Sequence, residues 1–433
     1  MSRAARAARA ARAARATRMS VVALGLALVA VASPAAAKLL VPMDASQTDH
    51  LKAYGLAFWA LERGGKLDWL LNYRGGSFLL PDDAALEREA RIRGVKTEPA
   101  GPAEEAQILA AIEDANMEKV VLEKAPRIAV YVPPYAVPWD DAVRLALDYA
   151  EVPYATLWDP QVLAGDLQKY DWLHLHHEDF TGQQGKFYAA YAGAEWYRAE
   201  KELQETTAHA LGFAKVSECK KAVARTIKEY VARGGFLFAM CSATDSYDIA
   251  LAAEGVDIVD VPYDGDPPDP GAQRRLDYSR TLAFRNFTLF TDPYVYEYSD
   301  LDVTNDAVPR GPSSFFTLFD FSAKNDPVPT MLTQDHTNAV PEFMGQTTGY
   351  RKGFLKPGIT VLGETEGTDE ARYIHGKFGK GTFTFLGGHD PEDYQHAVGD
   401  PPSNLSLHKS SPGYRLILNN ILFPAAEKKK QKT

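Results

Sequence analysis

Runs of apolar residues, separated by polar and turn-forming segments, predict the secondary structure of the chain. Between residues 38 and 124 this pattern predicts strands at LLVPM and at Lys66 to Asn72. It also predicts helices at Thr48 to Glu62, Asp82 to Arg93 and Ala103 to Asp114. Because strands and helices alternate, we expect residues 38–124 to form an N-terminal α/β part with a mostly parallel sheet.

A second alternation begins after Arg127 and predicts a larger α/β part over residues 125–425. Its expected strands are IAVYV, Pro153 to Trp158, Trp172 to His176, Phe236 to Cys241, Thr360 to Leu362, Ala371 to His375 and Thr382 to Leu386. Its expected helices are Trp139 to Tyr149, Val216 to Val231, Ser246 to Ala253 and a closing helix at Tyr414 to Leu422. Residues 260–345 are crowded with Pro, Asp and aromatic residues, which predicts an irregular, β-rich insertion of short strands and turns over the core. Residues 426–433 predict a disordered basic tail.

The first 37 residues have the order of a secretory signal peptide. An Arg-Ala-Ala repeat precedes the apolar segment VVALGLALVAVA, and Ser33 to Ala37 ends in an A-x-A pattern just before Lys38. An apolar core of this length is too short to span a bilayer, which takes about 20 residues, and no second run of that length follows. If translation starts instead at Met19, export is still expected. We therefore expect a periplasmic or secreted protein with no stable membrane insertion.

Composition and charge narrow the classes of partner. The chain has 433 residues with 45% apolar and 24% charged, which is enough for a globular protein with a proper core. Its 47 basic and 57 acidic residues give a formal net charge of −10. The first 37 residues hold six Arg and no acidic residue, so the rest of the chain has 41 basic and 57 acidic residues and a net charge of −16. Such an acidic surface disfavours nucleic acid and anionic lipid, and a small-molecule amide or a sugar is the expected ligand.

The two cysteines, Cys219 and Cys241, are expected to remain unpaired. Cys219 falls on the helix Val216 to Val231, and Cys241 ends the strand that follows Gly234 and Gly235. Helix and sheet layers lie roughly 10 Å apart, whereas a disulfide needs a Cα separation of about 4.4–6.8 Å. A bridge would require distortion.

Cys241 occupies a position suited to a catalytic nucleophile. The segment Ala239 to Asp245 joins a buried strand to a helix, and ligands of parallel sheets bind beyond the carboxyl ends of strands. A thiol on such a turn lies next to helix N–H groups, which lower its pKa and can hold an oxyanion. Ser242, Thr244 and Asp245 are the candidate substrate-binding residues on this turn. The alternative is an ordinary buried cysteine of the core.

Two further groups follow strands. Gly387 to Asp393 supplies His389 as a general base, with Asp390 or Glu392 to orient it, or else it is only a glycine-rich turn with a capping Asp. The second group is His174-Leu175-His176-His177-Glu178-Asp179, where period-2 alternation sends His174 and His176 to one face and His177 to the other.

Two roles are open for this second group. We assign His176, His177, Glu178 and Asp179 to the substrate-binding rim and expect neither a metal nor another cofactor. An H-x-H pattern with nearby acids can nevertheless bind Zn²⁺, with His389 and Asp390 as the obvious source of the remaining ligands.

These motifs carry a resemblance. Residues 234–245 (GGFLFAMCSATD), residues 379–390 (GKGTFTFLGGHD) and Leu416 to Asn420 resemble the ThuA-like, or trehalose-utilisation, branch of the class I glutamine amidotransferase-like superfamily, over about residues 127–423. The resemblance implies a flavodoxin-like sheet with helices on both faces and a site at the elbow. ThuA-like proteins typically have His where this chain has Cys241, and class I amidotransferases have Cys there with a later His-x-Glu. Here the elbow is A-x-C-x-A, and Asp-Pro-Glu follows His389.

The mature chain is also similar to exported bacterial proteins labelled asparagine synthetase B, through segments such as MDASQTDHLKAYG and GGHDPEDYQH. Authentic asparagine synthetase needs an N-terminal nucleophilic Cys and an ATP-pyrophosphatase loop. Cleavage after Ala37 would expose Lys38, and the sequence contains no such loop.

Two functions are therefore expected. The first is hydrolysis of a glutamine-like amide, or amide transfer, by Cys241, His389 and an acid. The second is a non-catalytic or carbohydrate-handling envelope protein, whose sugar site would use Trp172, Tyr247, His176, His389 and nearby carboxylates.

Overall fold

The computed structural model describes residues 37–137 and 140–427, and residues from Ala37 onward group into one compact unit. The predicted signal peptide therefore lies, apart from Ala37, outside the described residues, as does the tail after Glu427. Among the described residues no helix is both long and apolar enough to cross a membrane.

The N-terminal part contains a five-stranded sheet in the order β4-β1-β3-β2-β5. Its strands are β1 (Lys38–Val41), β2 (Leu67–Leu71), β3 (Ser77–Pro81), β4 (Glu98–Ala100) and β5 (Glu118–Leu122). Every pairing in it is antiparallel, so the predicted mostly parallel sheet is wrong for this part. The pattern missed β3, which follows β2 after a tight turn at Tyr73–Gly76, and strands joined by so short a turn pair antiparallel.

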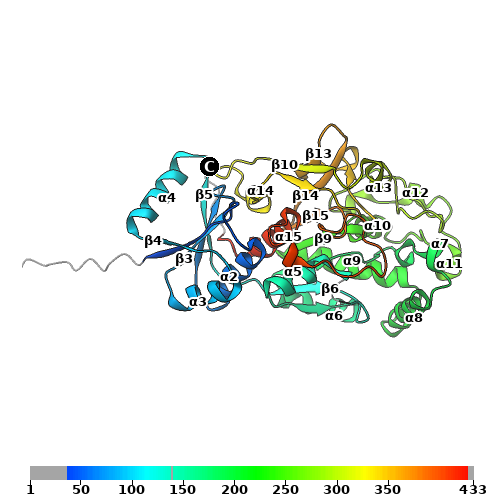
Figure 1. The fold of residues 1–433 in the computed structure, drawn as a ribbon. Helices are drawn as coiled ribbons and strands as arrows, with labels where there is room; N and C mark the ends of the chain where they lie inside the picture. The colour runs from blue at the N-terminus through cyan, green and yellow to red at the C-terminus, as the bar shows by residue number, and fades with distance from the viewer. Residues whose placement is uncertain (1–36, 138–139, 428–433) are drawn as a thin grey trace, which may run out of the picture. The chain divides into compact units, whose positions relative to one another are not determined.

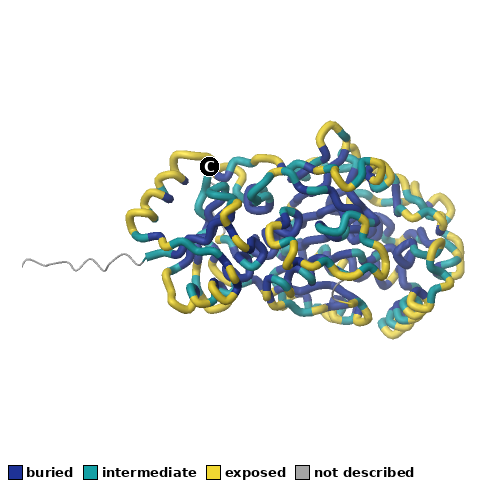
Figure 2. The backbone as a smooth tube through the Cα atoms, viewed as in Figure 1, coloured by how far each residue is buried: buried dark blue, intermediate teal, exposed yellow. Residues whose placement is uncertain are grey.

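Three helices belong to this part, namely α2 (His50–Glu62), α3 (Ala84–Arg93) and α4 (Pro102–Asp114). Asp49 and Asp83 begin α2 and α3 by accepting hydrogen bonds from the first backbone N–H groups. The helix α2 is buried along most of its length and packs against α5 (Ala142–Ala150) and α15 (Pro412–Leu422) of the larger part. Helix α4 buries only Ile108 and Ile112, and Figure 2 shows its outer surface exposed.

The larger part is built on a ten-stranded mixed sheet in the order β11-β10-β13-β14-β15-β9-β8-β6-β7, with β12 paired to β14 (Figure 1). The parallel strands are β6 (Ile128–Tyr131), β7 (Ala155–Leu157), β8 (Trp172–Leu175), β9 (Phe236–Met240) and β15 (Gly381–Leu386). The antiparallel strands are β10 (Phe315–Leu318), β11 (Ala339–Pro341), β12 (Tyr350–Arg351), β13 (Thr360–Thr365) and β14 (Glu370–Phe378). The protein is thus a mixed α/β protein.

Alternate residues of the central strand β9 enter two different apolar clusters. Phe238 and Met240 pack with residues of α2, α5 and α15, and Leu237 and Ala239 pack with residues of α9 (Val216–Arg233) and α10 (Asp245–Ala252). Helices therefore cover both faces of the parallel strands, as the continuous apolar run at Phe236–Met240 predicts.

The remaining helices are α6 (Asp159–Leu163), α7 (Tyr188–Tyr191), α8 (Glu195–Ala210), α11 (Val261–Asp264), α12 (Ala272–Arg275), α13 (Thr304–Ala307) and α14 (Pro327–Leu332). Residues 260–345 hold short helices as well as the expected strands, and its strands β10 and β11 extend the large sheet on the side of β13. Both cysteines are free, which confirms the expectation that they are unpaired.

Candidate functional site

Three parallel strands bring the candidate residues to one edge of the large sheet. Leu175 of β8 lies opposite Ala239 of β9, and Met240 of β9 lies opposite Leu386 of β15. Because the strands are parallel, the segments that follow them emerge on the same side. These segments begin with His176, Cys241 and Gly387.

Cys241 occupies a strained turn between β9 and α10. Its φ is +52°, in the left-handed region that costs a residue with a Cβ about 1–2 kcal/mol. Two contacts tie the turn to the end of β8: the N–H of Ala243 donates to the carbonyl of His176 at 3.0 Å, and the Ser242 hydroxyl donates to the carbonyl of His177 at 3.0 Å. Strain held in place by neighbouring contacts in this way is common at functional sites.

The sulfur of Cys241 is shielded and surrounded by backbone donors. Only 2% of the residue is exposed, and the N–H of Gln346 donates to Sγ at 3.3 Å. Burial raises the pKa of the thiol to about 11, although the N–H groups of Gln346, Ser242 and Thr347 act in the opposite direction. The resting thiol is therefore protonated at neutral pH, and the lowered pKa expected for this turn is wrong for the closed site.

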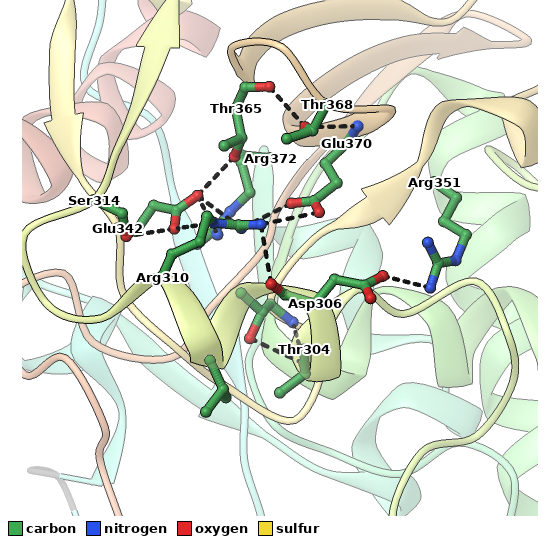
Figure 3. Close-up of polar contacts among 12 residues, drawn as sticks. Thr304, Asp306, Arg310, Ser314, Glu342, Arg351, Thr365, Thr368, Glu370 and Arg372 are labelled. Atoms are coloured by element: carbon green, nitrogen blue, oxygen red, sulfur yellow. Dashed lines mark hydrogen bonds and ion pairs between the residues drawn. The ribbon is translucent and has the colours of Figure 1, made fainter.

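A buried ion-pair network, shown in Figure 3, anchors the start of the segment that leads to Gln346. Arg372 is fully buried; its Nη1 lies 3.2 Å from Glu342 Oε1, and its Nη2 donates to the carbonyl of Phe343 at 2.7 Å. Arg310 pairs with both Glu342 and Glu370, at 3.0 and 2.8 Å. The network anchors residues 342–343, from which the chain continues to Gln346.

His389 lies against the same segment. The backbone N–H of His389 donates to the carbonyl of Met344 at 2.9 Å. The two segments are so close that a Cβ placed on Gly345 would lie 2.9 Å from the backbone nitrogen of His389. Burial lowers the pKa of the imidazole, which is therefore neutral, and its Nδ1 has no hydrogen bond. Among the described residues no hydrogen bond joins the His389 ring to the sulfur of Cys241.

The two acids proposed to orient His389 are engaged elsewhere. Asp390 accepts hydrogen bonds from the Tyr414 and Ser403 hydroxyls, each at 2.9 Å. Glu392 pairs with His408 at 2.6 Å. The chain turns at Pro391, so both carboxylates face the segment that leads into α15, and neither is within hydrogen-bonding contact of the His389 imidazole.

His389 instead joins a group of imidazole rings. Its ring centroid lies 4.4 Å from that of His176, 5.4 Å from that of His177 and 4.5 Å from that of His396. One ligand nitrogen each from His176, His177 and His389 lie within 4.8 Å of one another. Both ring nitrogens of His176, with the residue 1% exposed, lack a hydrogen bond.

Two aspartates at the start of α5 face this group. Asp141 Oδ1 lies 3.8 Å from His176 Nδ1 and 3.4 Å from His174 Nε2. Asp140 Oδ2 lies 3.7 Å from His177 Nε2. Asp141 is also the cap of α5, because its Oδ1 accepts hydrogen bonds from the N–H groups of Val143 and Arg144.

The predicted alternation, with His174 and His176 on one face of the strand and His177 on the other, fails at His177. Strand β8 ends at Leu175, so His176 and His177 have left the pleat, and both rings contact His389. His174 remains inside the strand, where its Nδ1 contacts the carbonyl of Phe238 at 3.2 Å. A period of two holds only while the backbone is extended and paired.

Most of the predicted substrate-binding residues build the turn and loops of the site. Thr244 donates to the carbonyl of Cys241 at 2.7 Å, and the buried Asp245 accepts from the Thr347 hydroxyl at 2.8 Å. Asp179 accepts hydrogen bonds from the N–H and hydroxyl of Thr181, and Glu178 is buried. Trp172 and Tyr247, 1% and 0% exposed, are core residues, so their predicted role in stacking on a sugar is wrong.

The site also contains four residues that the sequence pattern does not predict for it, namely Asp140, Asp141, His396 and Gln346. An Asp pair before a helical pattern is the ordinary sign of a helix cap, which is one of the roles that Asp141 has. Two cavities in the described part of the chain, of about 310 and 270 Å³, are lined by neither Cys241 nor His389.

No protein-family model matches the chain, and no curated protein matches it. Two solved structures of cytoplasmic proteins from Salmonella typhimurium align over 70% of this chain and 100% of their own, at 11% and 12% identity and TM-scores of 0.34 and 0.36. An exo-β-1,4-mannosidase from Opitutaceae bacterium strain TAV5 aligns over 60% of this chain and 31% of its own, with 12% identity and a TM-score of 0.25. Likenesses this low carry no argument about function.

Proposed function

We propose that this protein is a glutamine amidotransferase-like hydrolase in which Cys241 attacks a primary amide and His389 accepts the thiol proton. The observation that carries the proposal is the left-handed backbone of Cys241 at the turn between β9 and α10. A cysteine that packs only as an apolar side chain has no need of this strain.

The order of the parallel strands supports a flavodoxin-like core for this hydrolase. Numbered along the chain, β6, β7, β8, β9 and β15 lie side by side in the order 2-1-3-4-5. This order is the flavodoxin-like one, in which ligands bind beyond the carboxyl ends of the strands. Cys241 follows β9 and His389 follows β15 at that edge.

The proposed reaction uses the backbone N–H groups that face the sulfur, together with the imidazole of His389, which follows the neighbouring strand β15. Cys241 Sγ forms a bond to the amide carbon, its proton passes to His389, and the N–H groups of Gln346 and Ser242 hold the oxyanion. Collapse of the tetrahedral intermediate breaks the C–N bond, and His389 gives the proton to the leaving ammonia. Water then hydrolyses the thioester. Because Cys241 is 2% exposed, the segment carrying Gln346 must move before the substrate can reach Sγ.

The test is ammonia release from glutamine, asparagine and simple primary amides by the mature chain. Cys241→Ala should abolish release, and the matched variant Cys219→Ala should retain it, because Cys219 is buried on α9 beside Asp159. A thioester adduct on the Cys241 peptide, found by mass spectrometry, would support the mechanism. Release that persists in Cys241→Ala would refute it.

A second candidate, carbohydrate binding, is favoured by a group of aromatic side chains beside the site. The rings of Tyr191, Trp196 and Tyr296 lie 5.7, 5.8 and 6.0 Å from that of Phe187, and Trp196 and Tyr296 are 37% and 44% exposed. Gln346 Nε2 donates to the carbonyls of Gly185 and Tyr296, at 2.8 and 3.2 Å. Exposed rings of this kind are platforms for sugars.

Oligosaccharide titrations followed by tryptophan fluorescence test this candidate. Trp196→Ala should weaken binding at least several-fold, whereas Phe315→Ala, which removes an exposed aromatic of β10, should not. Equal affinities in the two variants would exclude the aromatic group as a sugar site.

We also propose that the protein is exported. The support is the order of charged, apolar and small residues over 1–37. Fractionation of cells expressing the full chain should place the protein outside the cytoplasm, and a chain starting at Lys38 should stay inside. Retention of both forms in the cytoplasm would contradict export.

A further inference from the structure

We propose that His176, His177 and His389 form a binding site for a single divalent transition-metal ion of the Zn²⁺ class, with its fourth position open. This inference rests on the arrangement of the imidazoles. It shares His389 with the proposed hydrolase, in which the imidazole can accept the thiol proton only while no ion is bound to it. Three imidazole ligands with an open fourth position make a recognised zinc arrangement.

The ligand spacing is close to what a tetrahedral ion requires. Zn–N distances of about 2.0–2.1 Å place the nitrogens of a tetrahedral site about 3.3 Å apart. One nitrogen from each of the three histidines already lies within 4.8 Å of the others. Binding of an ion would therefore draw these nitrogens together from a separation of at most 4.8 Å to about 3.3 Å.

The three histidines also present nitrogen atoms that nothing else uses. His176 Nε2, His177 Nδ1 and His389 Nδ1 are all buried and have no hydrogen-bond partner. Buried polar atoms are almost always satisfied, so an unsatisfied nitrogen on each of these three neighbouring rings needs a common explanation. A metal ion would satisfy all three.

A carboxylate lies near the other nitrogen of two of these rings. Asp141 Oδ1 lies 3.8 Å from His176 Nδ1, which leaves Nε2 for the ion, and Asp140 Oδ2 lies 3.7 Å from His177 Nε2, which leaves Nδ1. Carboxylates in this position orient ligating imidazoles and raise their basicity. Asp141 is itself held by two backbone N–H groups of α5.

The other two histidines of the group are committed elsewhere. His174 Nδ1 contacts the carbonyl of Phe238, and its Nε2 lies beside Asp141. His396 is held between Asp393 and Asp140, at 3.2 and 3.3 Å, and stacks on His389. These contacts place His174 and His396 around the site and leave three ligands.

The test is a titration of the metal-stripped mature protein with Zn²⁺ and Co²⁺ alone. We expect one ion per chain, and for Co²⁺ the intense visible absorption of a four-coordinate ion. His176→Ala, His177→Ala and His389→Ala should each weaken Zn²⁺ binding at least 100-fold, since loss of an orienting partner alone typically costs 10–100-fold. The matched control His408→Ala, which removes a histidine paired with Glu392, should bind normally.

Thermal unfolding of the same proteins gives a second readout. Zn²⁺ should raise the unfolding midpoint of the wild type and leave that of His177→Ala unchanged, because an ion stabilises only the state that binds it. His177 is half-buried, whereas His176 is 1% exposed, so truncation of His177 should perturb the fold less than truncation of His176. Absence of stoichiometric binding by the wild type, or Zn²⁺ affinity equal to that of the wild type in all three variants, would overturn the proposal.

One variant separates this proposal from the amide hydrolase. Cys241→Ala should bind Zn²⁺ like the wild type, because its sulfur is not a ligand, and it should have no amidase activity. Amidase activity is therefore measured on the metal-stripped wild type, in which His389 is free to accept the proton. Absence of activity there, with Zn²⁺ binding intact, would refute only the hydrolase. Amidase activity without metal binding would refute only the metal site.

Discussion

The backbone N–H of Gln346 donates a hydrogen bond to Sγ of Cys241 at 3.3 Å, between residues that are 105 positions apart in the chain. This contact joins the segment after β11 to the turn after β9 and closes the space above the sulfur. The side chain of Gln346 extends the closure, since its Nε2 donates to the carbonyls of Gly185 and Tyr296. Access to Cys241 therefore depends on this segment.

The thiol of Cys241 should react slowly at neutral pH and faster as the pH rises. Burial raises its pKa to about 11, so only a small fraction is thiolate, and the alkylation rate should rise about tenfold per pH unit between about pH 7 and 10. The measurement is iodoacetamide labelling followed by peptide mass spectrometry. Labelling of the Cys241 peptide that is rapid and independent of pH would contradict the closed, protonated thiol.

The variant Cys241→Gly should be more stable than the variant Cys241→Ala. Both substitutions remove the sulfur, but only alanine keeps the Cβ in the left-handed region at φ +52°. We expect Cys241→Gly to have a free energy of unfolding about 1 kcal/mol higher than that of Cys241→Ala, measured by urea unfolding. If alanine were equally stable, the turn would not be strained.

The buried pair of Glu342 and Arg372 should be essential for stability. Both side chains are fully buried, so Glu342→Gln would leave the Arg372 guanidinium without its counter-charge and should cost about 3–5 kcal/mol in the free energy of unfolding. The control is Asp306→Asn, which breaks a half-exposed pair with Arg351 and should cost about 1 kcal/mol or less. Similar losses in urea unfolding of the two variants would contradict this assignment.

Much of the fold can be predicted from the sequence, because apolar runs and periodicity are local. The strands β6, β7, β8 and β9 fall within the predicted segments, and β15 and α9 lie mostly within theirs. The small sheet was mispredicted because Ser77–Pro81 follows a tight turn, which sets its strand direction.

The candidate site is less predictable, since its contacts are long-range. His389 and His176 follow strands that the alternation identifies, whereas His396 meets Asp140 across 256 positions of the chain. The acids next to His389 in sequence, Asp390 and Glu392, contact other partners because the chain turns between them. Proximity in sequence was therefore a poor guide to which carboxylate faces an imidazole.

Asp245 should make the protein less stable as the pH rises. It is fully buried, its Oδ2 has no hydrogen bond, and burial raises its pKa from 3.8 to about 7, although the Thr347 hydroxyl acts in the opposite direction. The folded chain thus holds the proton more tightly than the unfolded chain, whose Asp has a pKa of about 3.9. The stabilisation from this group is complete below about pH 4 and is lost as the pH rises through about 7.

Asp245→Asn tests this linkage, because asparagine resembles the protonated acid and does not titrate. Three units of pKa correspond to about 4 kcal/mol, so the free energy of unfolding of the variant, relative to wild type, should rise by up to that amount between about pH 4 and 8. Urea unfolding at several pH values measures the difference. A difference that stays constant over this range would mean that Asp245 is ionised in the folded protein, with a charge that the contact with Thr347 alone could not compensate.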